Sequence, residues 1–346
     1  MDEVSIISAG YKELFGVSDI VVKALPESGS YRKYYRISDR SKTMIGVYNS
    51  NSEENEAFLG FTKHFISRSL PVPGLFGYIP DKQIYFLQDL GDLTLYTWLQ
   101  HKHTGNGFDD EAENLYRKIL DNLIHFQIEG IKDLDLDLCY PHKSFDRQSM
   151  MWDMNYFKYS FLKLIAVPFN EKSLESDFNV LADFLLETGQ EYFLYRDFQS
   201  ANIMLLDGAP WFIDYQGGRK GAAQYDAASL LYDAKAYIPE SYRLILINYY
   251  IENFCQRSGE DKLKFRYYFP GFSMIRLMQA LGAFGFRGLY ENKPTFTGSI
   301  VPAVKLLVQL IESGQFPVPL PELFKTVRLI PAQKVYKELE GGFDKR

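Results

Sequence analysis

Two short apolar runs joined by an Asp-Gly pair place the strongest local constraint on the fold. Residues 203–206 form the first run, residues 211–213 form the second, and Asp207-Gly208 is typical of a two-residue hairpin turn. The pattern therefore predicts a β-hairpin. Asn202 precedes the first strand and Asp214 follows the second, so we expect the hairpin to bring these two side chains together at one end.

The side chains at this end of the hairpin suit phosphate chemistry. A carboxamide oxygen beside a carboxylate oxygen is a hard site suited to Mg²⁺, which keeps several waters and prefers phosphate and carboxylate ligands. Asp197 lies just upstream and is free to accept a proton. Phosphoryl transfer to an alcohol needs such a base, and metal ligands that neutralise the phosphates. A D-x-x-x-x-N spacing on its own is more often a capped loop with a turn aspartate, but the hairpin and the second aspartate favour the phosphate site.

Asp197, Asn202 and Asp214, in this order, resemble the catalytic loop and metal-binding aspartate of the aminoglycoside phosphotransferase-like branch of the protein-kinase-like fold. The resemblance implies an enzyme that uses ATP and Mg²⁺. Asp197 would take the proton of the acceptor hydroxyl, and Asn202 and Asp214 would hold the metal. Arg196 would contact a phosphate or support the loop, and Tyr195 replaces the histidine that often opens this loop.

A narrower similarity points to one group of sugar kinases. Residues 195–202, 213–216 and 224–231 are similar to the cell-wall kinases that phosphorylate the anomeric hydroxyl of N-acetylmuramate and N-acetylglucosamine. This similarity implies an α+β, protein-kinase-like, two-lobed fold. Residues 1–90 would form a nucleotide-covering lobe built on a small antiparallel sheet, and residues 91–346 a mainly helical lobe that holds the catalytic loop and the acceptor site.

The N-terminal region has the strand pattern that such a lobe requires. Strands are predicted over residues 20–25, 31–37, 44–48 and 83–88, followed or preceded by polar turns. In the turn Ser28-Gly29-Ser30, backbone N–H groups and hydroxyls can approach phosphate oxygens. An ordinary hairpin turn explains the same three residues, and the resemblance favours the phosphate contact.

The lysine that usually holds the α- and β-phosphates on the third strand of this fold is missing. Residues 46–48 are Gly, Val and Tyr. The preceding strand offers Arg32, Lys33 and Arg36, and we expect Arg32 before the other two to supply the charge. The alternative is that these are solvated charges that discourage edge pairing of the sheet. Glu56 matches the position of the inward-facing acid of the following helix in the family. It either pairs with a substitute base or is a solvated acid of the first helical turn.

The resemblance also places an adenine contact at Gln88, Asp89 and Leu90, where the strand ends and the lobes would meet. A plain strand-to-helix loop explains the same residues.

Residues 216–221 form a basic, glycine-rich loop, which is either a contact for the acceptor or the γ-phosphate, or a mobile connection. The chain after residue 93 is predominantly helical by its apolar spacing, with helices over 93–99, 110–129, 144–165, 171–187, 241–255, 261–290, 299–311 and 317–339.

Composition excludes several classes of function. The 346 residues are 46% hydrophobic, enough for a sizeable core, and the net charge of −6 argues against a nucleic-acid or anionic-membrane partner. Cys139 and Cys255 are too few for a disulfide framework or a zinc site. The N-terminus lacks a secretory signal, and no uninterrupted apolar run reaches membrane-spanning length. We therefore expect a cytoplasmic protein. The resemblance to the sugar kinases implies that its partner is a small molecule, an amino sugar.

Two other functions remain open from the sequence. Without the strand lysine, the chain could be a pseudokinase that binds nucleotide or sugar without turnover. It could also be a kinase for another small alcohol, such as an aminoglycoside or a choline-like compound. A polycationic aminoglycoside is expected to select an acidic cleft, and the acidic residues are not visibly clustered at the expected acceptor helix, residues 144–165.

Overall fold

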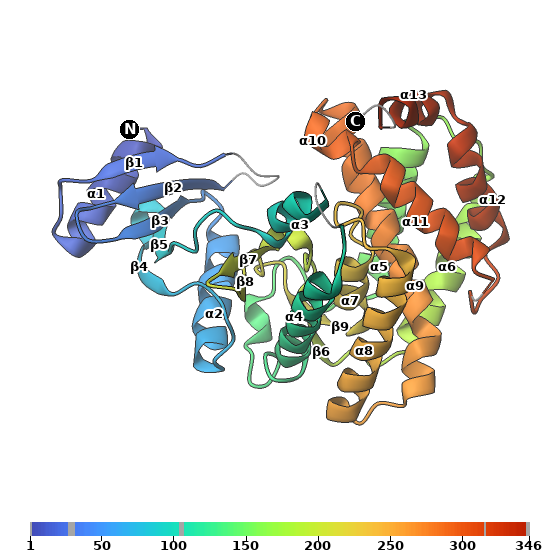
Figure 1. Ribbon diagram of the computed structural model, residues 1–346, viewed down its shortest axis with the longest axis horizontal. Coiled ribbons are helices and arrows are strands. Elements are labelled where there is room, and N and C mark those ends of the chain that lie inside the picture. Colours follow the sequence, from blue (N-terminus) through green and yellow to red (C-terminus); the bar gives the residue numbers. More distant parts are fainter. Residues whose placement is uncertain (1, 27–31, 104–106, 315, 344–346) are drawn as a thin grey trace.

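The computed structural model describes residues 2–26, 32–103, 107–314 and 316–343. A five-stranded antiparallel sheet lies at one end of the molecule and a bundle of helices fills the rest (Figure 1). The expected small sheet and helical remainder are therefore confirmed. The strand order is β1-β2-β3-β5-β4, with β1 Val21–Ala24, β2 Lys33–Ser38, β3 Thr43–Tyr48, β4 Leu75–Ile79 and β5 Ile84–Gln88.

Two helices, α1 (Glu3–Phe15) and α2 (Ser52–Ser67), pack on the sheet. Successive side chains of a strand point to opposite faces. On β5, Phe86 belongs to the core cluster around α1, whereas Tyr85 belongs to the cluster that contains the aromatic residues of α2. Gly16 ends α1 in the left-handed conformation, with φ 71°, as a C-terminal glycine does.

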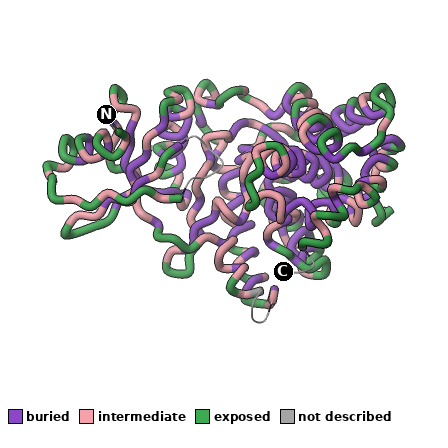
Figure 2. The backbone as a smooth tube through the Cα atoms, turned by 90° about the horizontal axis from the view of Figure 1, so that it is seen from above, coloured by how far each residue is buried: buried purple, intermediate pink, exposed green. Residues whose placement is uncertain are grey.

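Helix α9 is the centre of the helical part, because α5, α6, α7, α8 and α11 all pack against it. Buried segments run through this part, and exposed loops lie at its periphery (Figure 2). The α-helices are α3 Leu95–His103, α4 Asp110–Ile128, α5 Arg147–Phe157, α6 Glu171–Leu186, α7 Gln224–Leu231, α8 Glu240–Ser258, α9 Lys262–Phe284, α10 Pro294–Thr297, α11 Ile300–Glu312, α12 Pro321–Leu329 and α13 Lys334–Phe343. Short 3₁₀ turns are η1 Pro80–Lys82, η2 Leu136–Leu138, η4 Ser200–Asn202 and η6 Ile330–Ala332, and π-helical turns are η3 Lys158–Leu162 and η5 Gly285–Tyr290.

The predicted hairpin is confirmed. Strand β7 (Ile203–Leu206) pairs with β8 (Ala209–Phe212), and the turn residues Asp207 and Gly208 have φ values of 51° and 75°. Positive φ at both central residues is what a type I′ turn needs. The partner strand begins at Ala209, two residues earlier than the sequence predicts.

Helix α2 connects the sheet to the hairpin region through aromatic rings. Phe58 stacks on Tyr85 of β5 at 5.1 Å and on Tyr215, just after the hairpin, at 5.0 Å between ring centroids. The hydroxyl of Thr62 on α2 also lies 2.6 Å from the hydroxyl of Tyr215. One hydrophobic core therefore continues from the sheet into the helical part.

Several sequence-based boundaries were wrong. Strand β4 was missed, and the second half of residues 216–221 is a strand, because β9 (Arg219–Gly221) pairs with β6 (Tyr192–Leu194). The helices expected over 144–165 and 261–290 each change to a π-helical turn near their ends. The last predicted helix is two helices separated by η6, which contains Pro331, a residue that interrupts helical hydrogen bonding.

One segment, Pro294–Glu312, is long and apolar enough to cross a membrane by length and composition, with a mean hydropathy of 1.4. Lys305 and Gln309 interrupt the segment, so it does not contradict the expectation that no uninterrupted apolar run reaches that length. Half of this apolar stretch is buried inside the protein, and α11 packs against α9. A buried core helix passes the same test, so the packing accounts for its apolar character.

A close crossing between the two π-helical turns gives a test of the packing. A Cβ atom on Gly285 would overlap the carbonyl oxygen of Ser160, and backbone cannot move aside as a flexible side chain can. We expect Gly285→Ala to lower the free energy of unfolding by about 1–3 kcal/mol, measured by urea denaturation. The control is Gly341→Ala, because a Cβ at Gly341 meets no atom within 4 Å. Wild-type stability of Gly285→Ala would contradict this close approach.

Candidate active site

The loop that precedes the hairpin is held from below by one buried carboxylate. Asp226, at the start of α7, accepts hydrogen bonds from the backbone N–H groups of Tyr195, at 2.6 Å, and Arg196, at 2.9 Å. Arg196 has a φ of 81°, which is unfavourable for a side chain larger than glycine. The two hydrogen bonds stabilise this strained backbone and fix the direction in which Asp197 leaves the loop. Burial raises the pKa of Asp226 to about 7, although the two N–H groups oppose the rise.

The structure brings together the three polar side chains that the sequence singled out. The amide nitrogen of Asn202 donates to the backbone oxygen of Asp197, at 2.9 Å, and lies 3.3 Å from Oδ2 of Asp214. The Ile213 N–H donates to the Asn202 carbonyl, which closes the open end of the hairpin. Nε2 of Gln216 donates to Oδ1 of Asp214 at 2.8 Å. A carboxamide and a carboxylate therefore lie side by side next to Asp197.

The electrostatic surroundings of Asp197 favour a basic carboxylate. Burial, and next the negative charge of Asp214, raise the pKa of Asp197 above its usual value. Positive charges on Arg276, Arg196 and Arg219 oppose this rise. A carboxylate with a raised pKa binds a proton more readily.

Arg196 is directed towards α5. Its guanidinium forms two hydrogen bonds with the carboxylate of Asp153, at 2.7 and 2.5 Å, and a third with the hydroxyl of Tyr225 at 2.7 Å. It also lies over the rings of Phe145 and Tyr225, at 5.0 and 5.1 Å. This geometry ties the loop to α5, and a phosphate contact by Arg196 remains a prediction.

Arg32 lies at the cleft, next to the hairpin end. Its side chain is almost fully buried, with Nη2 2.8 Å from Glu54 and Nη1 3.7 Å from Asp214. Lys33 and Arg36 are engaged elsewhere, with Glu3 and with Asp89 and Asp92. Glu56 is exposed, which agrees with the solvated first-turn acid and not with an inward-facing partner of a base.

Glu54, two residues earlier on α2, is the inward acid. The N-cap of α2 is Asn51, whose side chain accepts a hydrogen bond from the N–H of Glu54. Since residues two apart on a helix point in different directions, the orientation that buries Phe58 directs Glu54 towards Arg32 and leaves Glu56 in solvent.

The expected adenine-binding residues lie where β5 ends. Leu90 is buried, Asp89 is bound by Arg36 at 2.7 Å, and Oε1 of Gln88 accepts from the N–H of Gly74 at 3.2 Å. A contact with adenine remains a prediction. Ser28, Gly29 and Ser30 lie outside the residues that the structure describes.

Comparison with known proteins decides the family. The model of the phosphotransferase enzyme family matches residues 21–265. The chain belongs to this family. The N-acetylmuramate/N-acetylglucosamine kinase of Pseudomonas aeruginosa is 24% identical over 216 residues, which are 61% of this chain and 59% of that kinase. The match thus spans less than two thirds of that relative.

Solved structures give the fold of this chain. A thermostable mutant of aminoglycoside phosphotransferase APH(4)-Ia has a TM-score of 0.56 at 14% identity, with 89% of this chain and 99% of that chain covered. The amicoumacin kinase hAmiN, solved with AMP-PNP, Ca²⁺ and amicoumacin, has a TM-score of 0.59 at 11% identity, with 92% and 95% covered. The expected protein-kinase-like fold is confirmed.

The chain has a cavity of about 110 Å³ beside Asp197. Arg276 and Gln279 of α9 line it together with Lys235 and Phe296. Arg276 is buried and donates to Ser229 at 2.8 Å and to Gln279 at 2.7 Å. Sequence analysis did not identify these residues as a site, although an arginine among the apolar residues of a buried helix was an available signal.

One residue that sequence analysis missed supports the loop from the other side. Asp233, after α7, accepts from the N–H and the hydroxyl of Ser200, at 3.0 and 2.5 Å. Arg219 on β9 is buried and donates to the carbonyls of Gly217 and Tyr140. Arg219 thus ties the basic segment to the backbone at Tyr140.

The raised pKa of Asp226 should make the stability of this protein depend on pH. Its folded-state pKa of about 7 exceeds the ordinary value of about 3.9, so the native state holds a proton that the unfolded chain has released. The free energy of unfolding should therefore fall as pH rises through this window, by about 1.4 kcal/mol per pH unit from this group alone.

The variant Asp226→Asn isolates this contribution. Because asparagine does not titrate, its free energy of unfolding should fall less than that of the wild type between about pH 5 and about pH 7, measured by urea denaturation. Equal pH dependence in the two proteins would contradict a raised pKa at Asp226.

Proposed function

We propose that this chain is an ATP-dependent kinase that transfers the γ-phosphoryl group to a hydroxyl of a small molecule. The observation that carries the proposal is the grouping of Asp197, Asn202 and Asp214 at the open end of the hairpin, with Asp226 bracing the loop. The same family includes kinases among its relatives and structural neighbours. A cytosolic setting, where ATP is available, suits this reaction.

The donor set fits Mg²⁺. The side-chain oxygens of Asn202 and Asp214 would hold it, and phosphate oxygens and water would complete its shell. Within the described residues, no group of three or more His, Cys, Asp or Glu side chains could hold a metal, and such a group is unnecessary for a metal bound largely through phosphate. When bound, Mg²⁺ neutralises charge on the transferred phosphates. The neighbour solved with AMP-PNP and Ca²⁺ supports nucleotide and divalent-metal use.

In this proposal Asp197 accepts the proton of the acceptor hydroxyl as the phosphoryl group moves. Because the transition state of such transfers is loose, most of the acceleration comes from positioning and charge stabilisation. Asp226 and Asp233, which hold the two sides of the loop, keep Asp197 in place. The raised pKa of Asp197 suits a proton acceptor.

Arg32 replaces the missing strand lysine in this proposal. Its guanidinium lies 3.7 Å from Asp214 and pairs with Glu54 of α2, which is the pairing that a phosphate-holding lysine makes in kinases. Its planar fork can bind two phosphate oxygens at once. The turn of Ser28, Gly29 and Ser30 precedes it in the chain, and the backbone around Gln88 to Leu90 would meet the adenine.

We expect Arg32→Met to raise the Michaelis constant for ATP by roughly tenfold, since a charge-assisted hydrogen bond to phosphate is lost. Initial rates of ADP release at varied ATP measure this. Lys33→Met is the matched control, because Lys33 is the adjacent cation and pairs with Glu3, away from the cleft. An unchanged ATP constant in Arg32→Met would remove Arg32 from nucleotide binding.

The acceptor that we propose is the anomeric hydroxyl of an N-acetylated amino sugar. The similarity to the N-acetylmuramate/N-acetylglucosamine kinase supports this choice. The cavity beside Asp197 offers the hydrogen-bonding side chains Gln279 and Arg276 and the aromatic ring of Phe296.

A panel of free sugars, aminoglycosides and choline, assayed for Mg²⁺-dependent ADP release, tests the proposal. We expect the highest kcat/KM with an N-acetylated amino sugar. The product should lose its reducing end and release phosphate in mild acid, since a phosphate on the anomeric oxygen forms a labile glycosyl phosphate. A product that keeps its reducing end would exclude anomeric transfer.

Asp197→Asn is the control for the chemical step. Its kcat should fall by about 10²–10⁴-fold, while ATP binding, measured by calorimetry, persists. Near wild-type turnover in this variant would exclude Asp197 as the base. Binding of nucleotide and sugar by the wild type without ADP release would instead identify a pseudokinase.

A further inference from the structure

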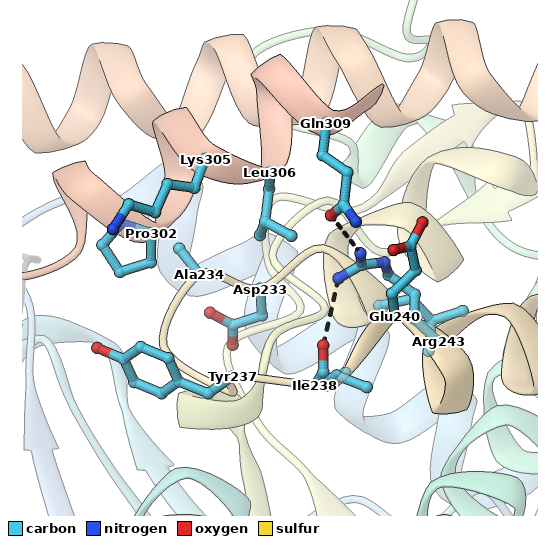
Figure 3. Close-up of a pocket in the computed structure, with 11 residues that line it drawn as sticks. Asp233, Ala234, Tyr237, Ile238, Glu240, Arg243, Pro302, Lys305, Leu306 and Gln309 are labelled. Carbon is cyan, nitrogen blue, oxygen red and sulfur yellow. Dashed lines mark hydrogen bonds between the residues drawn. The ribbon is translucent and has the colours of Figure 1, made fainter. Parts of the chain in front are cut away.

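A cavity of about 440 Å³ lies between α11 and the segment that joins α7 to α8. Figure 3 shows Pro302, Lys305, Leu306 and Gln309 of α11 on one side. The cavity shares Asp233 and Ala234 with the smaller cavity beside Asp197, but Asp197 does not line it. The segment after α7 therefore forms a wall of two different cavities. A volume of this size is typical of small-molecule sites.

Arg243, near the start of α8, lines this cavity. The side chain is 4% exposed, and its guanidinium donates to the carbonyl of Ile238 at 3.3 Å and to Oε1 of Gln309 at 2.8 Å. It lies over the ring of Tyr232 at 5.0 Å. In Figure 3 the guanidinium is held between Ile238 and Gln309, so two neutral groups on different elements fix its position.

The guanidinium of Arg243 has no ion-pair partner of the kind that Arg32 has in Glu54. The exposed Glu240 acts on its charge only from a greater distance. Among the described residues, no carboxylate oxygen lies within the 4.0 Å of an ion pair from the Arg243 guanidinium. Burial lowers the pKa of Arg243. A buried charge is costly unless it is paired, so an anionic partner would stabilise this arginine.

The carboxylates near the cavity do not fill this role. Asp233 is turned to the catalytic loop, where it binds Ser200, and it also accepts from the N–H of Lys235. Glu240 is exposed, at the edge of the cavity. Lys305, on the wall formed by α11, is a second cation, and its Nζ lies 3.4 Å from Oε1 of Glu340. The interior surface between these groups is apolar, formed by Leu231, Ala234, Ile238, Pro302 and Leu306.

We propose that this cavity binds a small organic anion, with its carboxylate on Arg243 and its apolar body against Ile238 and Leu306. A planar guanidinium and a carboxylate form a paired, charge-assisted contact. The apolar wall selects a ligand with a hydrocarbon or aromatic body over an inorganic ion. This site is separate from the proposed acceptor site, so it stands whichever hydroxyl compound is phosphorylated.

The test uses the full chain and three probes of matched size or charge: benzoate, the neutral benzamide and inorganic phosphate. Titrations followed by calorimetry and by ligand-observed NMR should show saturable binding of benzoate. Benzamide should bind at least roughly tenfold more weakly, because it lacks the charge that pairs with Arg243. Inorganic phosphate should also bind more weakly, because it has no apolar body.

Two variants and one control assign the binding to this cavity. Arg243→Met should weaken benzoate binding by roughly tenfold or more. Leu306→Trp, which fills the cavity and keeps Arg243, should do the same. Arg266→Met is the matched control, since Arg266 binds Asn248 and does not line this cavity, and it should bind benzoate as the wild type does.

Three results would overturn the proposal. They are the absence of saturable benzoate binding, wild-type benzoate affinity in Leu306→Trp, and tighter binding of inorganic phosphate than of benzoate. None of the readouts depends on turnover, so they separate this proposal from the kinase proposal. If Arg243→Met fails to fold, Leu306→Trp still decides.

Discussion

The geometry of the site depends on two hydrogen bonds from the loop backbone to a single buried carboxylate. Asp226 accepts both the Tyr195 and the Arg196 N–H groups, and between them the chain adopts a φ that a side-chain-bearing residue rarely takes. The loop therefore reverses direction at Arg196, sending its side chain towards α5 and the next side chain, Asp197, towards the cleft. A carboxylate is suited to this task because it accepts from two donors at once.

The position of a charge in this molecule matters more than the strand that supplies it. A kinase-like cleft needs a cation near the metal side of the site, and Arg32 lies there although β3 offers none. The pairing of Arg32 with Glu54 fixes the guanidinium between helix α2 and Asp214. An arginine is longer than a lysine and can reach the same region from a neighbouring strand, and its planar group tolerates burial better.

The parts that the sequence predicted well are those set by local chemistry. The Asp207-Gly208 turn requires positive φ and fixes the hairpin register, and that register brings Asn202 next to Asp214. The parts that it missed depend on packing. Which acid of α2 faces inward is decided by the orientation of the whole helix on Tyr215 and Tyr85. Likewise, a basic, glycine-containing segment becomes strand β9 only because β6 lies beside it.

Three aromatic rings in series have a further consequence. Tyr85 belongs to the sheet, Phe58 to α2 and Tyr215 to the segment beside Asp214, and each ring stacks on the next. Solvent cannot enter between the sheet and the helical part without separating rings that also line the core of the catalytic region. The two parts should therefore melt together in a single cooperative transition, and a cut between them should leave neither half able to fold.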